Sequence, residues 1–178
     1  YLKKSDVIIV PVGSTEEHGP AGPLGLDTYV AIALAEDAAK QANVITAPPL
    51  WFGDSSHHLG FPGTISLRTS TLTSVIVDIC RSLARAGFRK IIFINGHKIA
   101  NLPGIVTAVK NVHEDDLKHL LLAIVDPSKI AKGIASKVKH SPEHHAGELE
   151  TSHILYKYPH LIKVKRLPTK NIPYQKIF

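Results

Sequence analysis

Short runs of β-branched and aromatic residues alternate with longer segments of helical periodicity along most of this chain. The clearest run is 90–94, Lys-Ile-Ile-Phe-Ile, which Asn95 and Gly96 end. In chain order, the other strands and helices that the pattern predicts are 7–12, 28–42, 44–47, 71–86, 102–113, 120–125, 130–138 and 148–158. Strands that alternate with helices in this way pack as a mainly parallel sheet with helices on both faces. The sequence therefore predicts an α/β fold.

The length and composition are typical of one globular unit. A chain of 178 residues can bury a single substantial core, so we expect one domain over 1–178. The hydrophobic fraction is 44% and no apolar run approaches the roughly 18 residues of a membrane span, so no membrane segment or signal peptide is expected. The chain opens at Tyr1 and contains no Met, which indicates a truncated N-terminus.

Cysteine content and charge narrow the class of protein further. Cys80 is the one cysteine, which excludes a disulfide framework and favours a reducing, cytoplasmic compartment. Lys and Arg number 21 against 15 Asp and Glu, and the net charge of +6 favours anionic ligands. The basic residues are scattered or lie in short groups such as 163–166 that lack interleaved aromatics, so we expect no nucleic-acid partner.

Side chains that bind metals follow two of the predicted strands. Glu16, His18 and Asp27 come after the strand at 7–12, and His97 comes after the strand at 90–94. The segment 145–150 adds a further His and two Glu residues. Because the carboxyl ends of parallel strands meet at one edge of the sheet, we expect these groups to converge. Mixed imidazoles and carboxylates suit Zn, Mn or Fe, and their number fits two ions that share a carboxylate and a water.

Each of these residues also has a simpler interpretation. Asp27 could be only the N-cap of its helix, and Glu148 only a carboxylate at a helix N-terminus. Glu17 reads as solvated or as a neighbour of the ligands. The loop 51–68 contains His57 and His58, and its length favours an active-site wall. Gly13-Ser14-Thr15 lacks the other glycines of a dinucleotide-binding turn.

Five ordered sequence blocks resemble the signature blocks of the creatininase (creatinine amidohydrolase) family. They are 11–20 (PVGSTEEHGP), 24–27 (LGLD), 61–67 (FPGTISL), 95–97 (NGH) and 145–152 (HAGELETS). The resemblance covers roughly residues 5–156 and leaves the tail 159–178 without a predicted function. It implies a layered α/β/α sandwich, two divalent metal ions per chain, hydrolysis of a non-peptide C–N bond and a homohexamer.

The resemblance also assigns roles by position. Glu16 and His97 would bind one ion, His18 and Glu148 the other, and Asp27 would bridge them. His145 matches a family histidine that transfers protons beside the metals, so His145 and Glu148 are the predicted catalytic residues. Glu150 matches a family acid that lies beside the metal ligands. From their positions in this chain, and not from the resemblance, His58 and Lys98 are also expected beside the metals or in contact with the substrate.

The chain departs from the family pattern at two places. Members often carry His-Leu-Pro-Leu where this chain has Ala21 to Leu24, and Gly-Gly-Asn where it has Lys98 to Asn101. In creatininase itself a Glu two positions after the strand-end His is a ligand, and Ile99 stands there in this chain. Glu148 would therefore have to replace it, which argues against creatinine as the substrate. Lys98 adds a cation that could pair with a carboxylate or phosphate of the substrate.

These features predict an enzyme that hydrolyses a small amide, formamide or cyclic amide through a metal-bridging hydroxide. A member that processes a peptide during cofactor maturation stays open as an alternative. A non-catalytic metal-binding member that lost its pocket is another, suggested by Ala21 and the change at 98–99. A redox enzyme with an iron site is a third.

Overall fold

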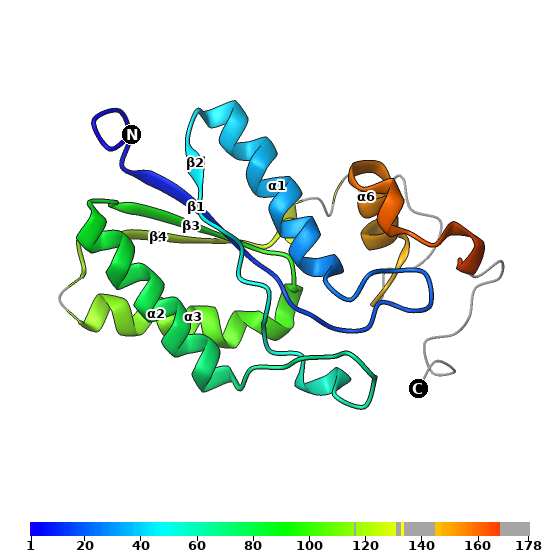
Figure 1. Cartoon of the computed structure of the whole chain (residues 1–178). Helices are drawn as coiled ribbons and strands as arrows, with labels where there is room; N and C mark the ends of the chain where they lie inside the picture. The colour runs from blue at the N-terminus through cyan, green and yellow to red at the C-terminus, as the bar shows by residue number, and fades with distance from the viewer. Residues whose placement is uncertain (116, 131–132, 134–144, 168–178) are drawn as a thin grey trace.

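The computed structural model describes residues 1–115, 117–130, 133 and 145–167 (Figure 1). Its strands are β1 (Val7–Val12), β2 (Ile45–Thr46), β3 (Lys90–Asn95) and β4 (Leu121–Val125). Its α-helices are α1 (Leu26–Ala42), α2 (Thr69–Ala86), α3 (Lys98–Glu114), α4 (Pro127–Ile130) and α6 (Glu148–Lys157). Short 3₁₀ turns lie at Ser56–His58 (η1), Pro159–Leu161 (η2) and Val164–Arg166 (η3).

The four strands form one parallel sheet in the order β2-β1-β3-β4. β1 and β3 lie at its centre and are paired over their whole length, from Val7 opposite Lys90 to Val12 opposite Asn95. This register brings the carboxyl ends of the two central strands to the same level. The prediction of an α/β fold with a parallel sheet is confirmed.

Helices cover both faces of the sheet, α1 on one face and α2 with α3 on the other (Figure 1). Alternate residues of β1 point to opposite faces: Val10 and Val12 pack in the core under α2 and α3, and Ile9 packs under α1. The larger core contains Phe93 and Ile76, both fully buried. The layered sandwich follows from this two-sided burial.

A third, smaller apolar cluster joins α6 to the start of α1. Leu26 of α1, Ile154 of α6 and Ile162 after η2 are its buried members. This contact holds the N-terminus of α6 near the carboxyl ends of β1 and β3 (Figure 1). None of the helices in the described part of the chain is long and apolar enough to cross a membrane.

Several boundaries differ from the predicted ones. α1 begins at Leu26, two residues early, and the strand expected at 44–47 is reduced to Ile45–Thr46. α3 begins at Lys98 and includes Pro103, although the sequence predicted a start near 102. Pro103 lies near the N-terminus, and the carbonyl that loses its bond belongs to Ile99, whose side chain is 77% exposed, so water can replace the partner. Most of the helix predicted at 130–138, and 140–144 of the predicted polar loop, lie outside the described residues.

Candidate metal centre

The carboxyl ends of β1 and β3 bring the first group of site residues together. Glu16 and His18 lie in the loop after β1, Asp27 is the second residue of α1, and His97 follows β3. Gly96 allows a close approach, because a Cβ built there would lie 2.1 Å from the backbone oxygen of Asp27. The start of α1 therefore rests directly on the turn that carries His97.

Asp27 connects two imidazoles through different oxygens. Its Oδ1 lies 3.2 Å from Nε2 of His18, and its Oδ2 lies 2.7 Å from Nδ1 of His97. Ser14 donates its hydroxyl to Oδ2 at 2.5 Å. The carboxylate is 2% exposed, so these neighbours replace the water that it would have in solution. Asp27 thus has the geometry of a bridge between two ligand sets.

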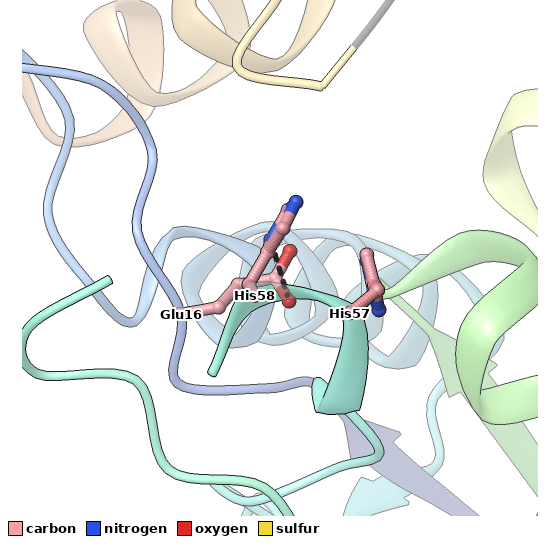
Figure 2. A group of neighbouring side chains, drawn as sticks. All are labelled: Glu16, His57 and His58. Atoms are coloured by element: carbon pink, nitrogen blue, oxygen red, sulfur yellow. Dashed lines mark ion pairs between the residues drawn. The ribbon is translucent and has the colours of Figure 1, made fainter. Parts of the chain in front are cut away.

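Glu16 is a second buried carboxylate with imidazoles on both oxygens. Its Oε2 lies 3.4 Å from Nε2 of His97 and 3.3 Å from Nδ1 of His58. Its Oε1 lies 3.4 Å from Nδ1 of His145. Figure 2 shows His58 beside the Glu16 carboxylate, with His57 on the neighbouring turn. The loop 51–68 therefore contacts the ligand cluster, as expected of a wall of the site.

Three of the imidazoles share one hydrogen-bonding arrangement. His18 uses Nδ1 to donate to the carbonyl of Glu16 at 3.2 Å, and His97 uses Nε2 to donate to that of Asp54 at 2.9 Å. His145 uses Nε2 to donate to the carbonyl of Glu17 at 2.6 Å. In each neutral ring the other nitrogen keeps a lone pair, which faces Asp27 or Glu16. Metal-binding histidines are oriented in this way by backbone carbonyls.

The lone pairs and carboxylate oxygens cannot face one another without a positive charge between them. Both are acceptors, so a proton or a metal ion has to lie in each contact. Ligand atoms about 2.0–2.2 Å from a tetrahedral ion lie roughly 3.3–3.5 Å apart, which matches the distances from the Glu16 carboxylate to Nδ1 of His58 and to Nδ1 of His145. Among the described residues, four groups of three side chains have their ligand atoms within 4.8 Å of one another, and two of these groups are Glu16, Asp27 and His97, and Glu16, His18 and His145. The residues fit divalent ions.

Burial and mutual charge shift the pKa values of these groups strongly. Burial raises the pKa of Glu16 to about 7, with His97 acting in the opposite direction. Burial alone would lower the pKa of His18, but the charge and hydrogen bond of Asp27 outweigh it and raise that pKa to about 9. Burial alone would raise the pKa of Asp27, and the charge of His18 with the hydrogen bonds of both imidazoles lowers it instead. A metal ion would compete with protons for these groups.

His58 has a different electrostatic character from His18. Burial, followed by the nearby His145, lowers the pKa of His58 to about 4. Its ring is therefore neutral at pH 7. A neutral imidazole beside Glu16 suits a ligand or a substrate contact better than it suits an ion pair.

The start of α6 brings the remaining predicted residues to the site. Glu148 and Glu150 lie in its first turn, where the helix dipole favours carboxylates. Glu150 pairs with Lys98, so the predicted free cation already has a carboxylate partner. Glu148 is half-buried and does not belong to the ligand sets found among the described residues. Its role as a ligand stays a prediction.

Sequence reasoning missed some groups that the structure brings to the cluster. His57 forms a further ligand set with Glu16 and His58, and its ring stacks on His97 with centroids 5.8 Å apart. Glu17 pairs with His145 at 3.2 Å, which agrees with one of its two interpretations from the sequence, a neighbour of the ligands. The adjacent histidines in a long loop were a sequence signal for the set of Glu16, His57 and His58. The carbonyl of Asp54 had no signal, since backbone acceptors are common to all residues.

The sequence of this chain is similar to those of known proteins. The family model described as "Creatininase: Creatinine amidohydrolase" matches residues 1–177. The chain is 34% identical over 173 residues to the 3-dehydro-scyllo-inosose hydrolase of Thermotoga maritima, covering 89% of this chain and 52% of that protein. It is 40% identical over 109 residues to the mycofactocin precursor peptide peptidase of Mycolicibacterium smegmatis, covering 58% and 43%. The chain thus spans about half the length of these relatives.

Solved structures agree with this fold. A crystal structure of creatinine amidohydrolase (creatininase) superposes with a TM-score of 0.86 at 26% identity, over 97% of this chain and 74% of that one. Two further creatininase structures are described as a manganese form and as a zinc–zinc mutant form, with TM-scores of 0.81 and 0.74.

Proposed function

Because the chain belongs to the creatininase family, we propose that it is a metal-dependent hydrolase of a C–N bond in a small amide, formamide or cyclic amide. The observation that carries this proposal is the pair of contacts of Asp27. Each oxygen faces a different imidazole, and each of those imidazoles is oriented by a backbone carbonyl.

The residues divide into two ligand sets and one proton-transfer group. Glu16, Asp27 and His97 would hold one ion, and His18, Asp27 and Glu148 the second. Divalent ions held there would lower the pKa of a water toward neutrality and polarise the carbonyl of the substrate. His145, whose Nδ1 faces the cluster, would accept there the proton that the attacking water loses and deliver it to the departing nitrogen. The Glu17 carbonyl keeps the ring in that orientation.

Zinc, manganese and iron all suit this donor set of imidazoles and carboxylates. Two ions per chain are supported by the two oxygens of Asp27 and by the zinc–zinc form of a related creatininase. The second position after His97 bears Ile99 and not a carboxylate, so the second ion depends on Glu148.

The substrate pocket would contain the Lys98–Glu150 ion pair at its edge. An anionic substrate would therefore compete with Glu150 for Lys98. To reach Lys98, such a substrate would need its carboxylate or phosphate close to the scissile amide.

Hydrolysis of a peptide is a second candidate. It is favoured by the 40% identity over 109 residues to a protein named as a mycofactocin precursor peptide peptidase. A homohexamer in a reducing cytoplasm is expected from the family resemblance and from the single buried Cys80. Sedimentation analysis would test the hexamer.

The first experiment is elemental analysis of protein purified without added metal, followed by assays on formamides, cyclic amides and short peptides. About two ions per chain and turnover that a chelator removes would support the hydrolase. No metal after reconstitution would overturn it and favour the non-catalytic alternative, and oxygen consumption with bound iron would favour the redox one. Cleavage of peptides alone would select the second candidate.

A further inference from the structure

A closed ring of hydrogen bonds surrounds the outer side of His97. The Asn101 side chain donates through Nδ2 to Oδ1 of Asn95 at 3.4 Å, and the backbone N–H of His97 donates to the same oxygen at 3.1 Å. His97 donates through Nε2 to the carbonyl of Asp54 at 2.9 Å. The backbone N–H of Asp54 donates to Oδ1 of Asn101 at 2.9 Å and closes the ring.

Asn101 is the member that joins separate segments. It lies on α3, and its Nδ2 also donates to the carbonyl of Gly13 at the end of β1, at 3.0 Å. Both Asn101 and Asn95 are fully buried. Gly53 leaves room for this side chain, since a Cβ at Gly53 would lie 2.3 Å from Oδ1 of Asn101. One amide thus fixes β1, β3 and the loop before η1 relative to one another.

The ring of hydrogen bonds determines which nitrogen of His97 can bind a metal. A carbonyl only accepts, so the Asp54 carbonyl requires the proton of His97 to be on Nε2. The lone pair is then on Nδ1, which is the atom that faces Asp27. If the Asp54 carbonyl moved, the imidazole of His97 could rotate or exchange its tautomer, and Nδ1 would no longer be held toward Asp27.

We propose that Asn101 is a positioning residue for the metal ligand His97, acting through the backbone of Asp54. The inference rests on the proposed metal-dependent function and extends it to a residue that touches neither the metal nor the substrate. Outer partners of metal ligands typically contribute 10- to 100-fold to metal affinity.

Backbone strain beside the ring supports a functional role. Lys98 has φ of 40°, in the left-handed region that lysine rarely adopts, and its carbonyl accepts a hydrogen bond from Nδ2 of Asn95 at 2.5 Å. Such conformations persist where surrounding contacts hold them, often at functional sites. Asn95 therefore fixes His97 on one side and the strained residue on the other.

The test is zinc binding by Asn101→Ala, measured by competition with a chromogenic chelator, with Val112→Ala as the matched control. Val112 is fully buried on the same helix and belongs to the apolar core. Both variants lose buried contacts, but only Asn101→Ala breaks the ring of hydrogen bonds. We expect a 10- to 100-fold weaker zinc affinity in Asn101→Ala and wild-type affinity in Val112→Ala.

A second variant and a second readout keep the test decisive if Asn101→Ala does not fold. Asn101→Asp retains the acceptor for the Asp54 N–H but places an oxygen where Nδ2 donates to Gly13 and Asn95, so it should also weaken zinc binding. Nitrogen-15 shifts of His97 in the zinc-loaded protein should indicate Nδ1 coordination in the wild type and a mixture in the variants. Wild-type affinity and shifts in both variants would overturn the inference. Absence of zinc binding by the wild type would instead contradict the proposed function.

Discussion

At the scale of single residues, both ions of the proposed centre depend on Asp27, because its two oxygens face different imidazoles. Asp27→Asn should reduce the bound metal to near zero and turnover by roughly 10²-fold or more. Elemental analysis and activity are measured on the same sample. Asp37→Asn is the control, since Asp37 is exposed on the same helix and pairs with Lys157. Normal metal content in Asp27→Asn would contradict the bridging role.

Cys80 gives a prediction about pH. The thiol is fully buried in the larger core, and burial raises its pKa to about 12. The thiolate is the reactive form and a raised pKa lowers its fraction, so at pH 8 the folded protein should react on the order of 10³-fold more slowly than an ordinary thiol. Alkylation followed by mass spectrometry measures this, with the denatured protein as the reactive control. Rapid labelling of folded protein would show that the helix pair α2–α3 opens.

Much of the site could be predicted from residue types and their positions after strands. Glu16, His18, Asp27 and His97 follow the two strands that are central in the sheet, and the structure brings them together. The carbonyl of Asp54 could not be predicted, because its role depends on where a loop crosses the site. The pairing of Lys98 with Glu150 joins residues 52 positions apart in two helices, and charge alone did not reveal it.

At the scale of elements, the contact of Gly96 with the start of α1 has a testable consequence. A methyl group at Gly96 would collide with the backbone of Asp27, which cannot rotate away as a side chain can. Gly96→Ala should therefore destabilise the fold by about 1–3 kcal/mol and weaken metal binding, because it moves α1 away from His97. Gly60→Ala is the matched control, with open space around the added Cβ.

Urea unfolding and zinc titration of both variants measure the two effects. If Gly96→Ala binds zinc as the wild type does, the close contact is not what places Asp27. A small gain of stability in Gly60→Ala would reflect the unfolded state, because alanine leaves the unfolded chain fewer conformations than glycine does.

Elements were predictable where periodicity was strong. The strands β1, β3 and β4 and the helix α2 lie close to their predicted bounds, since each has a continuous apolar pattern and α2 ends at Gly87. The start of α3 was not predictable from the pattern, because Pro103 usually marks a helix start and here lies within the helix. β2 is short because it pairs with β1 over only two residue pairs, Ile8 with Ile45 and Ile9 with Thr46.

At the scale of the whole molecule, the site exists only when distant segments come together. The loop after β1, the start of α1, the turn after β3 and the segment before α6 each provide side chains of the candidate ligand sets. In the unfolded chain these groups are separated by up to 129 positions, from Glu16 to His145. A metal that binds all of them therefore binds the folded state in preference to the unfolded one.

Metal binding should consequently stabilise the protein against unfolding. At free zinc of about 100 times the dissociation constant, one site adds roughly 2.7 kcal/mol, and a second site adds a similar amount. Thermal or urea unfolding with added zinc, compared with a chelator, measures the difference, and the midpoint should rise with zinc concentration. Asp27→Asn should show no such dependence, because it lacks the group that joins the two ligand sets. If zinc stabilises Asp27→Asn as much as the wild type, the ions bind elsewhere. If zinc stabilises the variant by about half of the wild-type gain in free energy of unfolding, Glu16, His97 and their neighbours hold a single ion without Asp27.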